Sequence, residues 1–228
     1  MLYFLSTSGS VKAQDSITLN QYGLQVIRTI DLYCTSVADH PSRQLVSLNR
    51  NPSIQLDLRY ASSGNFLGVP LYPPIKTTYL CRAAASQLEL IQQKLSESGL
   101  GLKIFDAYRP YSVTEKMWEK VPDDRYAANP KNGSGHNRGV AVDLTLIEQS
   151  SGVELDMGTG FDNFSDTAHH AFTQLPDTVL RNRKLLRTIM EAQGFVALET
   201  EWWHYSLPDA RQYPLLDLTF ETLAKSCR

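Results

Sequence analysis

The sequence predicts an α+β fold in one domain. Residues 77–98 and 176–194 repeat apolar side chains at helical spacing, whereas 100–108 and 140–147 alternate apolar and polar side chains as strands do. Helices and strands mixed in this way indicate a single α+β domain. Because the chain has no internal repeat, low-complexity block or obvious linker, we expect that domain to span residues 21–228, behind a flexible lead of residues 1–20.

Composition is ordinary for a globular protein and gives no reason to expect nucleic acid or a membrane as a partner. The 228 residues, 42% of them hydrophobic, are enough for a sizeable core. A net charge of −2 gives no electrostatic reason to expect nucleic acid or an anionic membrane. No apolar run approaches the ~20 residues that span a bilayer, so no membrane span is expected. The oligomeric state stays open.

The N-terminus and the cysteines bear on location. Residues 1–5 and the small-residue segment to Gln14 resemble the tail of a secretory signal without its basic start, and a disordered extension explains them equally well. Cys34, Cys81 and Cys227 form no CxxC pair, so a cysteine metal site is not expected. In an oxidising compartment one disulfide and one free thiol would form, in a pairing that the sequence does not choose. We expect a periplasmic location, with the cytoplasm as the alternative.

The elements before the middle of the chain follow from local pattern. Residues 22–37 fit either a short helix or a strand, and 53–60 alternate as a strand. Residues 61–74, rich in Gly, Ser, Asn and Pro, predict a loop. Over 77–98 one helical face is apolar and Gly99 lies where a helix ends. That face comprises Leu80, Ala84, Leu88, Ile91 and Leu95.

In the second half, Ser112 and Glu115 match a capping box, which predicts a helix from Ser112 through Trp118. Pro176 and Asp177 open a longer helix that Gly194 ends. Residues 122–138 are predicted to form a polar loop, and residues 151–173 a long functional loop. Strands are predicted at 140–147, 195–198 and 202–206, and the tail from residue 208 is predicted to be irregular.

A metal site is predicted by two distant motifs. His136 and Asp143 share a glycine-bounded motif, and His204 ends a Glu-Trp-Trp-His motif. Structural zinc sites usually fill four positions with Cys and His, whereas a His/Asp/His set leaves a position for water, as catalytic sites do. Glu201 is the natural base for that water. A lone histidine is more often a hydrogen-bonded polar residue than a metal ligand. It is the combination of two histidines, an aspartate and a nearby glutamate that predicts a zinc hydrolase.

Both motifs require irregular backbone. His136 and Asp143 are seven residues apart and would lie on opposite faces of a regular strand, so the segment Gly135–Gly139 must turn His136 back towards the metal. Glu201 and His204 would also face opposite ways, which predicts a turn or bulge at Glu201.

Other polar residues have both a functional and an ordinary interpretation. Arg109 lies at the end of a predicted strand. It is either a surface residue or a hydrogen-bond donor to a developing oxyanion, and Asp106 would hold it in place. Ser134 binds substrate or only the loop backbone. Asp162 binds a substrate ammonium or is a solvated loop acid. His169 and His170 are weaker candidates for further ligands, since three are already assigned.

The combination Ser-x-His-x-x-Gly-x-Ala-x-Asp with Glu-x-Trp-His resembles the zinc D-Ala-D-Ala metallopeptidases, which share a fold with the Hedgehog signalling domain. Within them the chain resembles the VanX-type D-alanyl-D-alanine dipeptidases. Matching segments cover roughly two-thirds of the chain and exclude its first fifty residues. They include Asp57–Tyr60, Asp106–Pro110, Ser134–Leu146, Met157–Asp162 and Glu201–Tyr205.

The resemblance implies a small antiparallel sheet flanked by helices, with one Zn²⁺ per chain bound by His136, Asp143 and His204. It further implies that Glu201 is the catalytic base and acid and that Arg109 stabilises the oxyanion. The pocket for a small dipeptide substrate, D-alanyl-D-alanine, would be lined by Ser134, Tyr60 and Asp162.

Two alternatives remain. One is a D,D- or L,D-carboxypeptidase acting on longer peptidoglycan stems, whose relatives have a more open groove; the segment 157–171 favours the dipeptidase. The other is a non-catalytic, zinc-stabilised binding module, which would have no need for Glu201 and Arg109.

Overall fold

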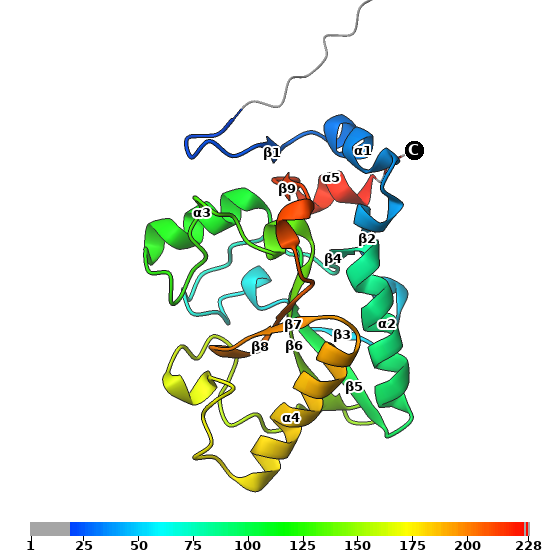
Figure 1. Cartoon of the computed structure of the whole chain (residues 1–228), viewed down its shortest axis with the longest axis vertical. Helices are drawn as coiled ribbons and strands as arrows, with labels where there is room; N and C mark the ends of the chain where they lie inside the picture. The colour runs from blue at the N-terminus through cyan, green and yellow to red at the C-terminus, as the bar shows by residue number, and fades with distance from the viewer. Residues whose placement is uncertain (1–18, 226, 228) are drawn as a thin grey trace, which may run out of the picture.

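A computed structural model describes residues 19–225 and 227 (Figure 1). The predicted lead, residues 1–20, lies outside this part of the chain except for its last two positions, and one domain over 21–228 stays a prediction. The helices are α1 (Ile30–Ala38), α2 (Arg82–Ser96), α3 (Tyr111–Lys120), α4 (Asp177–Ala192) and α5 (Phe220–Ala224). The strands are β1 (Val26–Ile27), β2 (Leu45–Ser47), β3 (Gln55–Leu56), β4 (Tyr79–Cys81), β5 (Leu100–Asp106), β6 (Ala141–Glu148), β7 (Val196–Leu198), β8 (Glu201–Ser206) and β9 (Leu215–Leu216).

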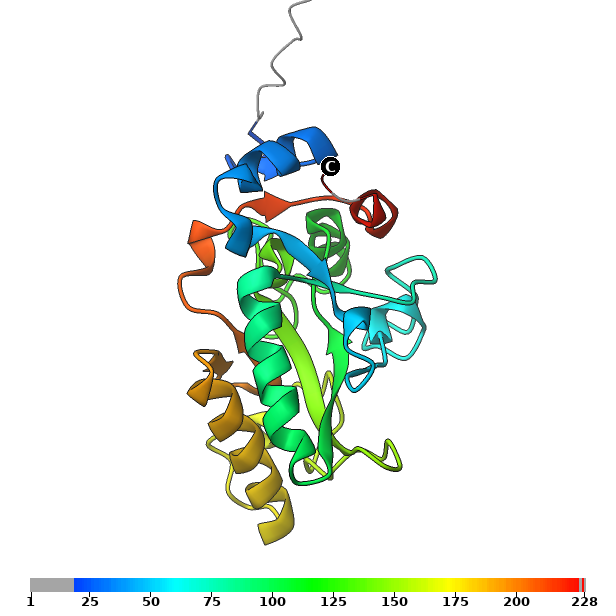
Figure 2. The ribbon, with the colours of Figure 1, turned by 90° about the vertical axis from the view of Figure 1, so that its right-hand side faces the viewer.

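The largest sheet has five strands in the order β3-β5-β6-β8-β7. All its neighbours are antiparallel except β3, which runs parallel to β5. Two small ribbons, antiparallel β2–β4 and parallel β1–β9, complete the strands. Helices α2 and α4 lie on one face of the main sheet, and the segment that follows β3 lies on the other (Figures 1 and 2). The predicted α+β class, with a small and mainly antiparallel sheet flanked by helices, is confirmed.

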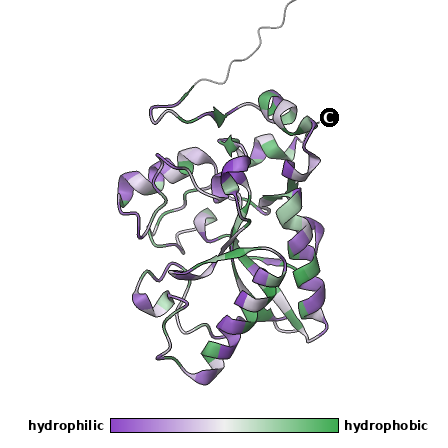
Figure 3. Cartoon of the chain, viewed as in Figure 1, coloured by the Kyte–Doolittle hydropathy of each residue, from purple (hydrophilic) through white to green (hydrophobic). Residues whose placement is uncertain are grey.

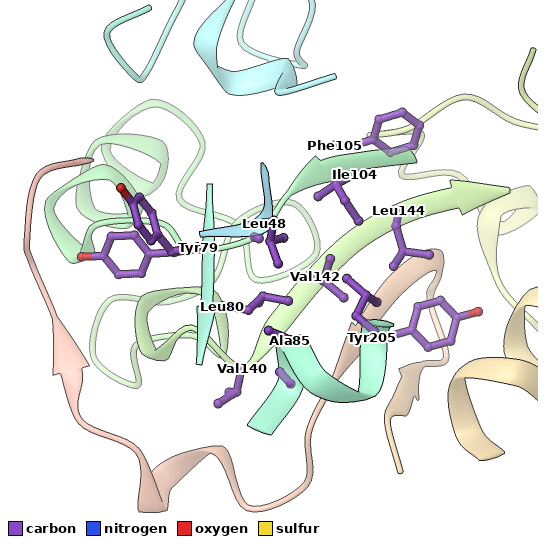
Figure 4. Packing of buried hydrophobic residues seen from close by; sticks show 14 of the residues in the cluster. Leu48, Tyr79, Leu80, Ala85, Ile104, Phe105, Val140, Val142, Leu144 and Tyr205 are labelled. Atoms are coloured by element: carbon purple, nitrogen blue, oxygen red, sulfur yellow. The ribbon is translucent and has the colours of Figure 1, made fainter. Parts of the chain in front are cut away.

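Strand β6 is buried on both faces. Val142 and Leu144 are fully buried beside Ile104 of β5 and Ala85 of α2 (Figure 4). The central strands are mainly hydrophobic, whereas α2 and α4 carry both hydrophobic and hydrophilic residues (Figure 3). Because side chains alternate along a strand, Asp143 lies on the face opposite to this core, and it is also buried. A carboxylate is thus held on the most deeply buried strand.

The helix predicted from residue 77 starts later, at Arg82, because Tyr79–Cys81 pair with β2 as β4. A partner strand outweighs the helical pattern of these three residues. The thiol of Cys81 then accepts a hydrogen bond from the Ala84 amide at 3.4 Å and caps α2. The strand predicted over 53–60 is also shorter, since only Gln55–Leu56 pair with β5.

The predicted capping box at Ser112 is wrong, because α3 begins at Tyr111 after Pro110. The amide of Ser112 instead donates to Oδ1 of Asp217 at 2.9 Å, a partner from the C-terminal segment. The sequence predicted that this segment is irregular, and this is wrong in part, since the segment contains β9 and α5. The ambiguous segment 22–37 contains both a strand, β1, and a helix, α1. No helix among the described residues is long and apolar enough to cross a membrane.

Cys34 of α1 and Cys227 form a disulfide, and Cys81 is a buried free thiol. We expect Cys34→Ser to lower the free energy of unfolding by about 3–5 kcal/mol, because the bond closes a loop with a sequence separation of 193. Urea unfolding of the oxidised protein, the reduced protein and the variant measures this. Reductant should not destabilise the variant further, and equal stability of oxidised and reduced wild type would contradict the prediction.

Candidate metal centre and active site

The candidate metal ligands come from two neighbouring strands and a turn. Asp143 of β6 and His204 of β8 are direct cross-strand partners, so their side chains leave the sheet on one face. His136 lies in the 3₁₀ turn His136–Arg138, which ends at Gly139 with a φ of 65°. A Cβ on Gly139 would collide with a leucine of β2, so this position requires glycine. The predicted glycine-bounded turn therefore brings His136 back to Asp143.

The three side chains converge on one point. Nε2 of His136 lies 3.3 Å from Nδ1 of His204 and 3.4 Å from Oδ2 of Asp143. Nδ1 of His204 lies 2.9 Å from Oδ1 of Asp143, and one ligand atom from each residue lies within 4.8 Å of the others. Ligands bonded at about 2.0–2.1 Å to a tetrahedral zinc ion are separated by roughly 3.4 Å. The spacing of these donor atoms fits such an ion.

The hydrogen bonds around the cluster also suit a metal. Nδ1 of His136 lies 2.7 Å from the carbonyl oxygen of Ala107, so this nitrogen donates its proton and Nε2 faces the cluster with a lone pair. Burial alone would raise the pKa of Asp143, but the two imidazoles outweigh burial and hold that pKa below its usual range. Lone pairs and an ionised carboxylate this close together repel unless a cation or a proton lies between them.

Glu201 reaches the same pocket because β8 starts irregularly. The register of the β7–β8 pair shifts between Ala197 and Leu198, and Leu198 pairs with Glu201. Glu201 and His204 consequently line one pocket, although they are three positions apart and a regular strand would direct them to opposite faces. Burial is the largest influence on the pKa of Glu201 and raises it, although the charge of His204 acts in the opposite direction. A carboxylate beside the ligand cluster, with a raised pKa, is suited to take up a proton.

Arg109 forms part of the pocket wall and is almost fully buried. Its Nε and Nη2 donate to Oδ2 of Asp106 at 3.1 and 2.8 Å, and the hydroxyl of Tyr72 donates to Oδ1 at 2.9 Å. Asp106 therefore braces Arg109, as predicted. The guanidinium carbon lies 5.0 Å from the ring centroid of Tyr60, which restricts it further. A cation fixed in this way can donate to an oxyanion without reorganising.

The pocket holds about 230 Å³ and includes the three residues predicted to contact substrate. The hydroxyl of Tyr60 donates to Oδ1 of Asp162 at 3.0 Å, and the amide of Phe66 donates to Oδ2 at 3.3 Å. Burial, and then the charge of Asp143, raises the pKa of Asp162 to about 7. The hydroxyl of Ser134 accepts from the amide of Asn137 at 3.2 Å, so this serine supports the loop backbone and also lines the pocket.

Sequence reasoning missed several residues of this site. Tyr126 lies in the segment predicted only as a polar loop, yet it lines the pocket and packs on Phe164 with ring centroids 4.9 Å apart. Asn137 is fully buried, and its amide nitrogen donates to the Arg109 carbonyl at 2.9 Å and to Oγ1 of Thr114 at 2.8 Å. An aromatic residue within a polar loop was the available signal for Tyr126, whereas an asparagine in a turn carries none.

A comparison of the sequence with models of known protein families identifies the family of this chain. Residues 42–225 match the peptidase family described as D-ala-D-ala dipeptidase. The chain belongs to this family. The match begins after α1 and includes every candidate residue of the site.

Curated members of the dipeptidase family are similar to most of this chain. The D-alanyl-D-alanine dipeptidase of Escherichia coli is 39% identical over 165 residues, which cover 72% of this chain and 84% of the relative. The D-alanyl-D-alanine dipeptidases of Streptomyces coelicolor and Enterococcus faecalis are each 32% identical, over 175 and 180 residues. They cover 68% and 71% of this chain, and 87% and 89% of those relatives.

In this member of the dipeptidase family, the two further histidines lie outside the ligand cluster. Among the described residues the candidate cluster consists of His136, Asp143 and His204. His169 lies 3.8 Å from a carboxylate oxygen of Asp166. The ring of His170 packs edge-on against Tyr205, with centroids 6.2 Å apart. The structure therefore gives neither histidine a place among the candidate metal ligands.

His170 should make the stability of this dipeptidase-family chain pH-dependent. Burial, and then the charge of Arg187, lowers the pKa of His170 to about 4. The unfolded chain, with a pKa near 6.5, binds more protons, so stability falls as the pH drops from about 6.5 towards 4. His170→Phe keeps an aromatic ring against Tyr205 but has no group that titrates. Between about pH 7 and pH 5 its free energy of unfolding should fall by about 1 kcal/mol less than that of the wild type, after allowance for the partial exposure of His170. Urea unfolding in chelator measures this, and an identical acid-induced loss in both proteins would contradict it.

Proposed function

We propose that the protein is a zinc-dependent dipeptidase that hydrolyses D-alanyl-D-alanine to two D-alanines, with one zinc ion per chain. The convergence of His136, Asp143 and His204 beside the carboxylate of Glu201 carries the proposal, since three protein ligands leave a position for water. The family match and the names of the relatives support the substrate.

When bound by these three ligands, zinc supplies Lewis-acid chemistry that polarises a carbonyl and lowers the pKa of water. Glu201 takes the proton of the attacking water and passes it to the leaving amine. Arg109, held by Asp106, donates hydrogen bonds to the oxygen of the scissile carbonyl as it gains negative charge.

The same pocket explains selection of a short substrate. Asp162, supported by Tyr60, receives the amino group of the dipeptide, whose positive charge favours the ionised form of a carboxyl with a pKa of about 7. Ser134, which also lines the pocket, contacts the substrate from the loop that precedes His136. A volume of about 230 Å³ suits a ligand with two small side chains.

The decisive experiment compares three substrates, D-Ala-D-Ala, L-Ala-L-Ala and a pentapeptide stem, with and without chelator. We expect hydrolysis of D-Ala-D-Ala that chelator abolishes and added zinc restores. Faster cleavage of the stem would favour the D,D- or L,D-carboxypeptidase instead. Zinc binding without any hydrolysis would favour the non-catalytic binding module.

We also propose that the protein works in an oxidising compartment, as the bacterial periplasm is. The disulfide between Cys34 and Cys227 supports this, because such bonds are rare in reducing cytoplasm. Fractionation of the producing cells with thiol labelling tests it. A reduced, cytoplasmic pool would overturn the proposal in favour of the cytoplasmic alternative.

Arg183 does not line the pocket, but it should affect substrate affinity by holding the segment that carries Asp162. This buried residue of α4 donates from Nε to the Met157 carbonyl at 2.7 Å and from Nη1 to the His169 carbonyl at 3.3 Å. Both ends of the segment that carries Asp162 are thus held by one guanidinium. Lysine cannot reach both carbonyls, so we expect Arg183→Lys to raise KM about tenfold, with a smaller change in kcat.

Steady-state kinetics with D-Ala-D-Ala measures the effect of Arg183→Lys. The matched control is Arg181→Lys, an exposed position on the same helix, which should leave KM unchanged. If Arg183→Lys lowers the melting temperature while KM is unaltered, the two contacts serve stability alone.

A further inference from the structure

A second pocket shares no lining residue with the active-site pocket. It holds about 350 Å³ and lies where β1 and β9 meet the turn that carries His136. Three arginines line it, Arg43, Arg138 and Arg211, together with the uncharged Gln25, Ser36 and Tyr213 among others. No aspartate or glutamate is among its lining residues.

Charge in this pocket is not neutralised within the part of the chain that the structure describes. Several arginines elsewhere have carboxylate partners, as Arg59 does in Asp57 at 2.8 Å and Arg187 does in Glu199 at 2.6 Å. Arg43, Arg138 and Arg211 form no ion pair with any described carboxylate. In a protein with a net charge of −2, three unpaired guanidinium groups around one hollow are a concentrated positive field.

Tyr213 orients two of the three arginines. Its carbonyl oxygen accepts a hydrogen bond from Nη1 of Arg138 at 2.5 Å. Its ring lies under Arg43, with the guanidinium carbon 5.8 Å from the centroid. Arg211 is two residues earlier in the same segment. The guanidinium groups of Arg43 and Arg138 are thus placed by one residue, which reduces the conformational entropy that they would lose on binding a ligand.

Proximity of these charges is unfavourable in the absence of an anion. Burial, and then the positive charge of Arg211, lowers the pKa of Arg138. A negatively charged ligand would relieve this repulsion, and guanidinium groups bind oxyanions through paired N–H donors.

We propose that the pocket formed by Arg43, Arg138 and Arg211 is a binding site for a phosphate group. A doubly charged oxyanion matches three guanidinium groups with no acid among them better than a single carboxylate does. The group could be free phosphate or a phosphate ester, and both present the same oxygens to the arginines. This proposal is independent of the hydrolytic function.

The test is calorimetric titration of the full chain with inorganic phosphate and with glycerol 3-phosphate, at constant ionic strength set by sodium chloride. We expect saturable binding that Arg43→Gln and Arg211→Gln each weaken about tenfold. Arg50→Gln, an exposed arginine outside the pocket, is the matched control and should bind as the wild type does. Tighter binding of glycerol 3-phosphate indicates an ester as the ligand, and equal or tighter binding of inorganic phosphate indicates the free ion.

Two results would overturn the proposal. One is the absence of saturable binding beyond the chloride background. The other is phosphate affinity that is equal in the wild type, Arg43→Gln and Arg211→Gln, which would place the ion elsewhere, for example at the metal cluster. Circular dichroism of each variant checks that it is folded, and a variant that fails to fold is replaced by Lys at the same position, which keeps the charge and should retain partial binding.

Discussion

Glu201→Gln should lower kcat for D-Ala-D-Ala about 10³-fold or more while zinc remains bound. Glutamine has nearly the same size but cannot accept a proton, and general acid–base catalysis typically contributes 10²–10⁴-fold. Glu201 is not among the three residues whose ligand atoms converge, so metal content should not change. Steady-state kinetics and zinc analysis of the same preparation measure the two quantities together.

The chain offers a matched control two residues away. Glu199 is exposed and pairs with Arg187 at 2.6 Å, outside the pocket. Glu199→Gln should therefore retain near-normal kcat, because it removes the same functional group at the surface. If Glu201→Gln is as active as Glu199→Gln, Glu201 is not the base and the proposed mechanism fails.

The ligand set was predictable because each half lies within a short motif. His136 and Asp143 are seven positions apart, and Gly135 and Gly139 on either side of His136 indicated that a turn must correct its direction. The β6–β8 pairing that joins Asp143 to His204 then supplies the long-range contact. The bulge before Glu201 was likewise predictable, because a regular strand cannot direct Glu201 and His204 to the same side.

What was missed depends on contacts between distant segments. The start of α3 is fixed by Asp217, whose carboxylate lies beside the Ser112 amide only after the C-terminal segment has folded back. β4 replaced the first turn of a predicted helix because β2 lies beside it. The placement of Tyr126 in the pocket depends on Phe164. Local pattern reports propensity, and such tertiary partners override it.

His136→Ala should remove the metal rather than only the activity. This side chain supplies one of three protein ligands, and its ring is already fixed by the Ala107 carbonyl at 2.7 Å. Alanine leaves two ligands, which are too few for a stable catalytic zinc site. We expect about one zinc per chain in the wild type and close to none in the variant after dialysis. Hydrolysis should fall to background in parallel.

The control for this prediction is a histidine of similar chemistry outside the cluster. His169→Ala removes an imidazole that lies near Asp166 and is not in the converging set, so zinc content should be retained. Apo wild type and His136→Ala should also differ in their response to added zinc, since only the wild type regains activity and is stabilised by the ion. Full zinc occupancy in His136→Ala would show that the ion binds elsewhere, and the convergence of His136, Asp143 and His204 would then need another explanation, such as a shared proton.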